Sequence, residues 1–151
     1  MVVAAVFEER YWYPDDGGQV WLAGYTPVDP ESGRYLGRDA PELAARGLRI
    51  AAVAGAARHH AEALDAPALG APVTFRRDPA NEHDPNAIEV RAGDLQIGWV
   101  PRELAAELAP ELDAGRPWSA VVLREQRPSP RDPRAGLTML LGPDTVIELK
   151  A

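Results

Sequence analysis

The sequence predicts a mainly β fold, namely a small OB-like antiparallel β-barrel with one main α-helix and an N-terminal β-hairpin extension. Several short stretches alternate between apolar and polar residues, as half-buried strands do. Turn residues separate these stretches, and the 151 residues include 13 glycines and 15 prolines. A single long stretch has the spacing of an amphipathic main helix.

The first part of the chain is predicted to be an extension of the barrel. Residues 2–25 contain two strand-like stretches on either side of the turn signal DDGG, which favours a hairpin. A long polar loop follows. We therefore assign residues 1–47 to an N-terminal hairpin and loop, and residues 48–151 to the barrel domain.

The barrel strands are expected in several short runs. LRIAAVAG at 48–55 is typical of a buried strand, and AARHHAEALDA has the composition of a short helix. NAIEVR and LQIGWV, separated by a turn, indicate an antiparallel hairpin. PWSAVVLREQ, LTMLL and TVIEL are the remaining expected strands. Alternation predicts one shared core made of Val73, Phe75, Ile88, Val90, Leu95, Ile97 and Trp99.

The main helix is predicted at residues 101–109. It begins with a proline, which suits the first turn of a helix. Leu104, Leu108 and Leu112 are spaced four apart and form one apolar stripe. Pro110 would clash with the carbonyl group of Ala106, so we expect the helix to break or restart there.

Composition and charge exclude several classes. There is no cysteine for disulfides or a thiolate zinc site, and no apolar run approaches the roughly 20 residues of a membrane span. We expect a soluble, cytoplasmic protein with no membrane contact. The net charge of −7 argues against nucleic acid. Between residues 48 and 102, however, the net charge is only −1, from six arginines and seven acidic residues.

The stretch FRRDPANEHDPNAIEV at 75–90 places many polar groups between two strands. Pro79 and Pro85 stiffen it, and its two asparagines suit turns. The adjacent His83 and Asp84 indicate more, because a rigid loop that projects a ring and a carboxylate resembles the wall of a binding pocket. An ordinary rigid connection is the alternative.

A second cluster is Arg58, His59 and His60. The arginine could hold a phosphate and a histidine could stack on a base; the alternative is the exposed first turn of a short helix. His59, His60, His83 and Asp84 could in principle bind a metal, but their spacing matches no metal motif. No metal or cofactor is assigned. With no phosphate loop, nucleophile elbow or metalloprotease helix, we expect a non-enzyme.

The ordered series RRDPANEHDPNAIEV and IGWVPRELAAEL resembles the HIRAN domain family, over about residues 48–149. The resemblance implies an OB-like barrel in DNA repair that binds the free 3′ end of single-stranded DNA. It implies that Arg58, His59 and His60 meet phosphate and bases. It also implies that the strand end is surrounded by Asn81, His83 and Asp84, with Asp84 on the 3′ hydroxyl group and Trp99 as a further contact.

This chain departs from the family pattern, since histidines replace the aromatic pair after the arginine and no helicase domain is present. Two rival functions therefore stay open. One is an adaptor that uses the same barrel to bind a protein partner or a small ligand. The other is a nuclease accessory with a metal at His83 and Asp84.

Overall fold

A computed structural model describes residues 1–11, 21–55, 68–127 and 136–150. Within these ranges the chain forms nine strands and two helices, so the predicted mainly β class is confirmed. The strands are β1 (Val2–Tyr11), β2 (Trp21–Pro27), β3 (Arg49–Ala52), β4 (Pro72–Arg77), β5 (Ile88–Ala92), β6 (Leu95–Trp99), β7 (Trp118–Arg127), β8 (Gly136–Pro143) and β9 (Glu148–Lys150), and the helices are α1 (Pro41–Ala45) and α3 (Arg102–Asp113).

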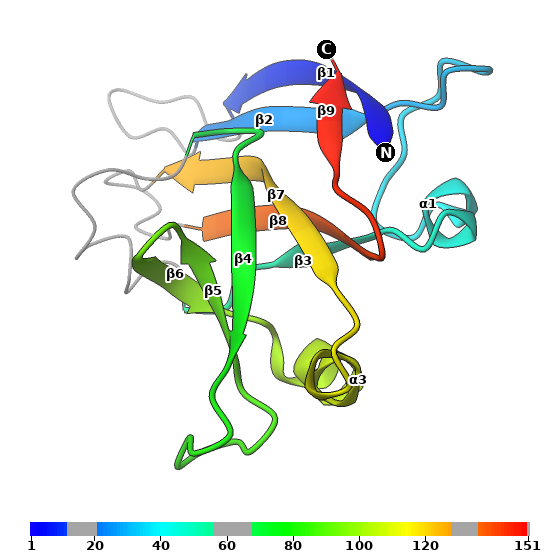
Figure 1. Cartoon of the computed structure of the whole chain (residues 1–151). Helices are drawn as coiled ribbons and strands as arrows, with labels where there is room; N and C mark the ends of the chain where they lie inside the picture. The colour runs from blue at the N-terminus through cyan, green and yellow to red at the C-terminus, as the bar shows by residue number, and fades with distance from the viewer. Residues whose placement is uncertain (12–20, 56–67, 128–135, 151) are drawn as a thin grey trace.

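Strand β7 is the junction of the sheet. It pairs with β8 along most of its length, with β4 near its start and with β2 near its end. The main path runs β6-β5-β4-β7-β2-β1-β9, and β3 joins through β8 (Figure 1). These strands do not close into a barrel, because β3 and β6 approach only through an isolated bridge between Ala54 and Trp99. The OB-like character of the fold stays a prediction.

The expected N-terminal hairpin is present. Strands β1 and β2 pair in antiparallel fashion from Ala5 opposite Pro27 to Tyr11 opposite Trp21. Gly24 allows β2 to cross close to β7, since a Cβ atom there would lie 2.3 Å from the carbonyl oxygen of Leu123. Strand β9 adds to β1 in parallel at residues 2–4. The division between extension and domain at residue 47 stays a prediction.

Two apolar clusters cover opposite faces of β7 and β8. Ala120 and Val122 of β7 belong to the first cluster, and Val121 and Leu123 belong to the second. This alternation follows from the two-residue period of a strand that is buried on both faces. The first cluster packs β4, β5, β6 and α3 onto the sheet, while the second packs β1 and α1.

The predicted shared core is largely present. Val73, Ile88, Val90 and Ile97 belong to the first cluster, and Phe75 packs against it while half-buried. The prediction is wrong for Leu95, which is 46% exposed. It pairs with Ala92 at the tip of the β5–β6 hairpin, where its side chain extends past the cluster. The prediction is also wrong for Trp99, which is half-buried and lies outside the cluster.

Helix α3 confirms the apolar stripe, with Leu108 buried and Leu104 and Leu112 half-buried against the first cluster. The expected break at Pro110 is wrong, since the helix continues to Asp113. Pro110 and Ala106 are both exposed. The carbonyl group that loses its helical hydrogen bond therefore lies on the solvent side, where water can replace the bond, and the buried face keeps the helix intact.

Candidate functional site

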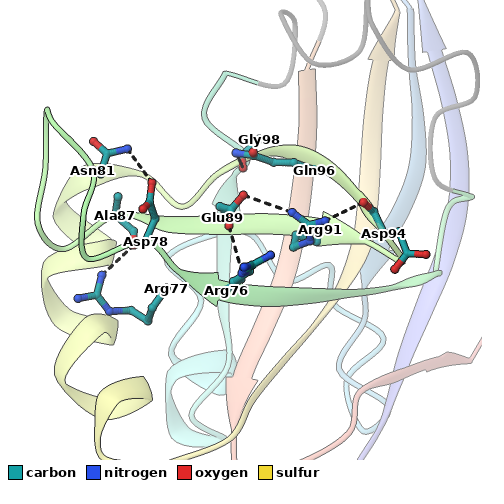
Figure 2. Close-up of polar contacts among 10 residues, drawn as sticks. All are labelled: Arg76, Arg77, Asp78, Asn81, Ala87, Glu89, Arg91, Asp94, Gln96 and Gly98. Carbon is teal, nitrogen blue, oxygen red and sulfur yellow. Dashed lines mark hydrogen bonds and ion pairs between the residues drawn. The ribbon is translucent and has the colours of Figure 1, made fainter.

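The β4–β5 loop, residues 78–87, is held by its own side chains. Asn81 is central: its Oδ1 accepts hydrogen bonds from the backbone N–H groups of His83 at 2.9 Å and Asp84 at 3.1 Å. Its Nδ2 donates to Asp78 Oδ2 at 3.2 Å (Figure 2). The amide of Asn81 is therefore committed to shaping the loop, as asparagine often is in turns.

Asp84 uses only part of its carboxylate within the loop. Its Oδ1 accepts a hydrogen bond from the backbone N–H of Asn86 at 2.9 Å. Its backbone oxygen accepts from Ala87 N–H at 3.1 Å. Within the described part of the chain, Oδ2 has no hydrogen-bond partner, and the residue is half-buried. One carboxylate oxygen is thus fixed in position and available.

Arg77, the last residue of β4, ties the loop to α3. Its Nη1 donates to the carbonyl oxygen of Ala87 at 2.8 Å (Figure 2), and its Nη2 donates to that of Pro85 at 3.0 Å. Its Nε donates to Asp113 Oδ1 at 2.9 Å. The side chain is only 15% exposed. This fork-shaped arrangement fixes the far end of the loop to the last residue of the helix.

The outer face of β4, β5 and β6 carries a polar network (Figure 2). Glu89 lies between Arg91 at 3.3 Å and Arg76 at 3.8 Å. Arg91 also donates to the backbone oxygen of Asp94 at 2.7 Å, and Gln96 donates to that of Gly98 at 3.2 Å. The Arg76–Glu89 pair joins β4 to β5, the two strands from which the loop extends, so the loop has a firm base.

The loop forms one wall of an open pocket of about 390 Å³. Its lining is Ala54, Asn81, His83, Asp84, Ala87, Trp99, Val100 and Arg102. Four residues chosen from the sequence thus lie together around one cavity: Asn81, His83, Asp84 and Trp99. The other three, Arg58, His59 and His60, lie outside the described residues.

Trp99 is the last residue of β6, and two hydrogen bonds of its backbone fix its position. Its N–H donates to the oxygen of Ala54 and its oxygen accepts from the N–H of Ala54, both at 2.8 Å. The position of the indole ring at the pocket therefore depends on the contact between β6 and the chain after β3. Sequence alternation placed this ring in the core, but the strand ends here and the core does not cover it.

Arg102 is a pocket residue that sequence reasoning missed. It is the first residue of α3 and is exposed, and its side chain forms no hydrogen bond or ion pair with the described residues. A cation is unfavourable at the positive end of a helix dipole. That conflict between residue and position, readable from the predicted helix start, could have flagged Arg102.

No three His, Asp or Glu side chains among the described residues come close enough together to hold a metal ion. Among the helices described, none has the length and apolar character that crossing a membrane requires.

The fold and site define a mainly β domain with an open pocket in which a few polar side chains stand among apolar ones, beside the tryptophan that ends β6. The sequence model of the HIRAN domain matches residues 51–133, which is more than half of the chain. The protein therefore belongs to the HIRAN domain family, as its loop and helix motifs suggested.

The chain is also similar to individual proteins. It is 52% identical over 48 residues to a Fanconi-associated nuclease 1 homolog of Oryza sativa subsp. japonica, covering 29% of this chain and 5% of that protein. The HIRAN domain of human HLTF matches with a TM-score of 0.48 and 26% identity, over 65% of this chain and 78% of that one. A Lactobacillus plantarum protein matches with a TM-score of 0.40 and 18% identity, over 64% and 99%.

Proposed function

We propose that this HIRAN domain is a non-catalytic, cytoplasmic module that binds single-stranded DNA at its free 3′ end, and that the pocket beside the β4–β5 loop is the binding site. The observation that carries the proposal is the meeting of three chemistries at one cavity. Asp84 offers a carboxylate oxygen, Trp99 an aromatic ring and Arg102 a cation. The 3′ end of a DNA strand presents a hydroxyl group, bases and phosphates. These groups suit Asp84, Trp99 and Arg102 respectively.

Asp84 would recognise the hydroxyl group. Its Oδ2 has no partner among the described residues, while Oδ1 is held by Asn86 N–H. A 3′ hydroxyl group can donate a hydrogen bond to such an oxygen, and hydrogen bonds to charged groups are the stronger ones. A terminal phosphate has the same charge as the carboxylate and would be repelled. Preference for an unmodified end follows.

Trp99 and His83 would provide stacking surfaces. Base–aromatic stacking contributes about 1–3 kcal/mol per base and tolerates any sequence. His83 is exposed, Trp99 is half-buried, and both line the cavity. The module would therefore read the end of the strand and not its sequence.

Arg102 and the start of α3 would hold the phosphates. The helix has 12 residues, its N-cap is Pro101, and no side chain caps its first turn. The early N–H groups of a helix and its dipole favour an anion, and a guanidinium group adds a charge-assisted hydrogen bond. Arg58, His59 and His60 are proposed to extend this surface. They follow shortly after Ala54, which lines the pocket.

The similarity to a protein named a nuclease supports a nucleic-acid ligand. This chain spans only 5% of that protein, so cleavage is not carried over to it. DNA repair is the proposed setting.

Fluorescence anisotropy tests the function with one labelled oligonucleotide that ends in a 3′ hydroxyl, a 3′ phosphate or a 3′-dideoxy group. We expect tightest binding to the hydroxyl end and a steep loss of affinity with salt. Equal affinity for hydroxyl and phosphate ends, or no binding at low salt, would reject the 3′-end proposal. Oligonucleotide shortening upon addition of Mn²⁺ would favour the nuclease accessory instead.

A further inference from the structure

A second hollow, of about 540 Å³, lies on the outer face of β1. Val3 is buried in the second cluster, so the alternation of the strand places Val2, Ala4 and Val6 outward, and the buried Ala5 also lines the hollow. Val2 is 55% exposed and Val6 is 40% exposed. The small Ala4 between them leaves space, and Val28 and Pro30 continue the apolar lining. We call this hollow the β1 groove.

The charged residues that line the β1 groove are both cations. They are Arg46, just after α1, and Lys150 of β9. Neither side chain forms a salt bridge or hydrogen bond with another described residue. The positive charge of Arg46 is one of the smaller causes that lower the pKa of Asp29. Its carboxylate oxygens, however, accept hydrogen bonds from Glu31 N–H and Ser32 Oγ, both at 3.0 Å.

The backbone beside the groove also has room for a partner. Strand β1 runs to Tyr11, but β9 pairs with it only from Val2 to Ala4. From Ala5 onward, no described strand occupies that edge. An extended segment can add to an open sheet edge through main-chain hydrogen bonds, with alternate side chains entering pockets on one face.

From these features we propose that the β1 groove is a docking site for an extended, acidic peptide segment of a partner protein. Apolar side chains of the segment would cover Val2, Ala4 and Val6, and its carboxylates would pair with Arg46 and Lys150. Charge complementarity selects this partner, because both charged residues of the lining are cations.

The β1 groove and the loop pocket lie at different ends of the molecule. Strands β1 and β9 are at the top of Figure 1, whereas α3 and the β4–β5 loop are at the bottom. The two sites share no lining residue. A partner in the groove would therefore leave the pocket accessible, and the docking proposal holds whether or not the pocket binds DNA.

An NMR titration of the ¹⁵N-labelled full chain tests the docking. The probes are the capped peptide EVDVEL and its lysine counterpart KVKVKL. We expect amide shifts at Val2, Val6, Val28 and Lys150 with the acidic peptide alone. Surface ion pairs contribute modestly, so Arg46→Gln combined with Lys150→Gln should weaken binding by about five- to ten-fold.

Two exposed valines make a matched pair of variants. Val6→Asp, inside the groove, should abolish the shifts, whereas Val146→Asp, which is 70% exposed and outside the lining, should leave them unchanged. Arg102→Gln should also leave peptide binding unchanged, which separates this site from the pocket. Equal shifts with both peptides, or none at millimolar peptide, would overturn the proposal. Shifts at these amides that follow protein concentration alone would also overturn it and assign the groove to self-association.

Discussion

Arg77 at the end of β4 and Asp113 at the end of α3 form an ion pair in which Nε lies 2.9 Å from Oδ1. They are 36 residues apart in the sequence. The same guanidinium group holds the carbonyl oxygens of Pro85 and Ala87. A single side chain thus fixes the pocket loop relative to the helix whose first residue, Arg102, lines the pocket.

Arg77→Ala should lower the free energy of unfolding by about 1.5–3 kcal/mol, because the charged hydrogen bonds of Arg77 to Asp113 and to the loop carbonyl groups are lost. The oxygen of Ala87 keeps its hydrogen bond from Asp78 N–H. Denaturant melts measure the loss in stability. Arg76→Ala is the matched control: its side chain is 69% exposed and its pair with Glu89 is long, at 3.8 Å. A change within about 0.5 kcal/mol is expected there. Equal losses in both variants would show that Arg77 does not hold the loop.

Asn81→Ala should disturb the loop itself. It removes an acceptor for two backbone N–H groups and a donor to Asp78. We expect a loss of about 1–3 kcal/mol in stability and faster hydrogen exchange at His83 and Asp84. Asn86→Ala is the comparison, since the side chain of Asn86 forms no hydrogen bond with the described residues. If hydrogen exchange at His83 and Asp84 is unchanged in Asn81→Ala, the Asn81 side chain does not hold the loop and would serve as a ligand contact instead.

Asp84→Ala should weaken binding to a 3′-hydroxyl oligonucleotide by roughly ten- to a hundred-fold, the equivalent of one charge-assisted hydrogen bond. Asp84→Asn should recover part of the affinity for a 3′-phosphate end, because the negative charge is gone. Anisotropy with both ends at one salt concentration measures this. If Asp84→Asn discriminates between the ends as the wild type does, the carboxylate does not recognise the end.

Arg102→Gln should reduce DNA affinity and lower the slope of log affinity against log salt by about 0.7, as expected for losing one phosphate contact to a single strand. Arg102→Lys should keep most of that slope. Arg38→Gln, another exposed arginine and not a pocket residue, should leave it unchanged. An unaltered slope in Arg102→Gln would place the phosphates elsewhere.

The pKa of Asp29 is lowered, mainly by the backbone N–H of Glu31 and then by the hydroxyl group of Ser32. A carboxyl group whose pKa is lower in the folded state stabilises the fold above its unfolded pKa, near 3.9. That contribution is lost as the pH falls through the folded value. Ser32→Ala should raise the pKa of Asp29 in an NMR titration, and Arg46→Gln should raise it less. The reverse order would contradict the assigned causes.

Sequence periodicity predicted much of the fold, because buried faces impose their spacing on the chain. The hairpins, the strand at 118–127 and the leucine stripe of α3 are examples. The predicted break at Pro110 failed because a local rule ignores which side of a helix faces solvent. Leu95 failed because alternation does not show where a core ends.

The site could be predicted only in part. His83 and Asp84 were chosen because they stand together in a stiff loop, whereas Trp99 was chosen only from the family resemblance, since alternation placed it in the core. All three line one pocket, and their role in binding stays a prediction. Arg102 was missed because the closeness of a helix start to a loop some 20 residues earlier is a tertiary fact. The role of Arg77 was missed for the same reason, since Asp113 lies far away in the sequence.

In the described structure, the two hydrogen bonds between Ala54 and Trp99 are the only backbone pairing between β6 and the chain after β3. Breaking two hydrogen bonds costs far less free energy than breaking a full strand ladder. The amide hydrogen of Trp99 should therefore exchange faster than the other amides of β6. A ligand that rests on the tryptophan ring would favour the joined state. By reciprocity, the intact Ala54–Trp99 hydrogen bonds would raise the affinity of the pocket for its ligand. Ligand binding and local opening of the sheet would thus be coupled at this pair of residues.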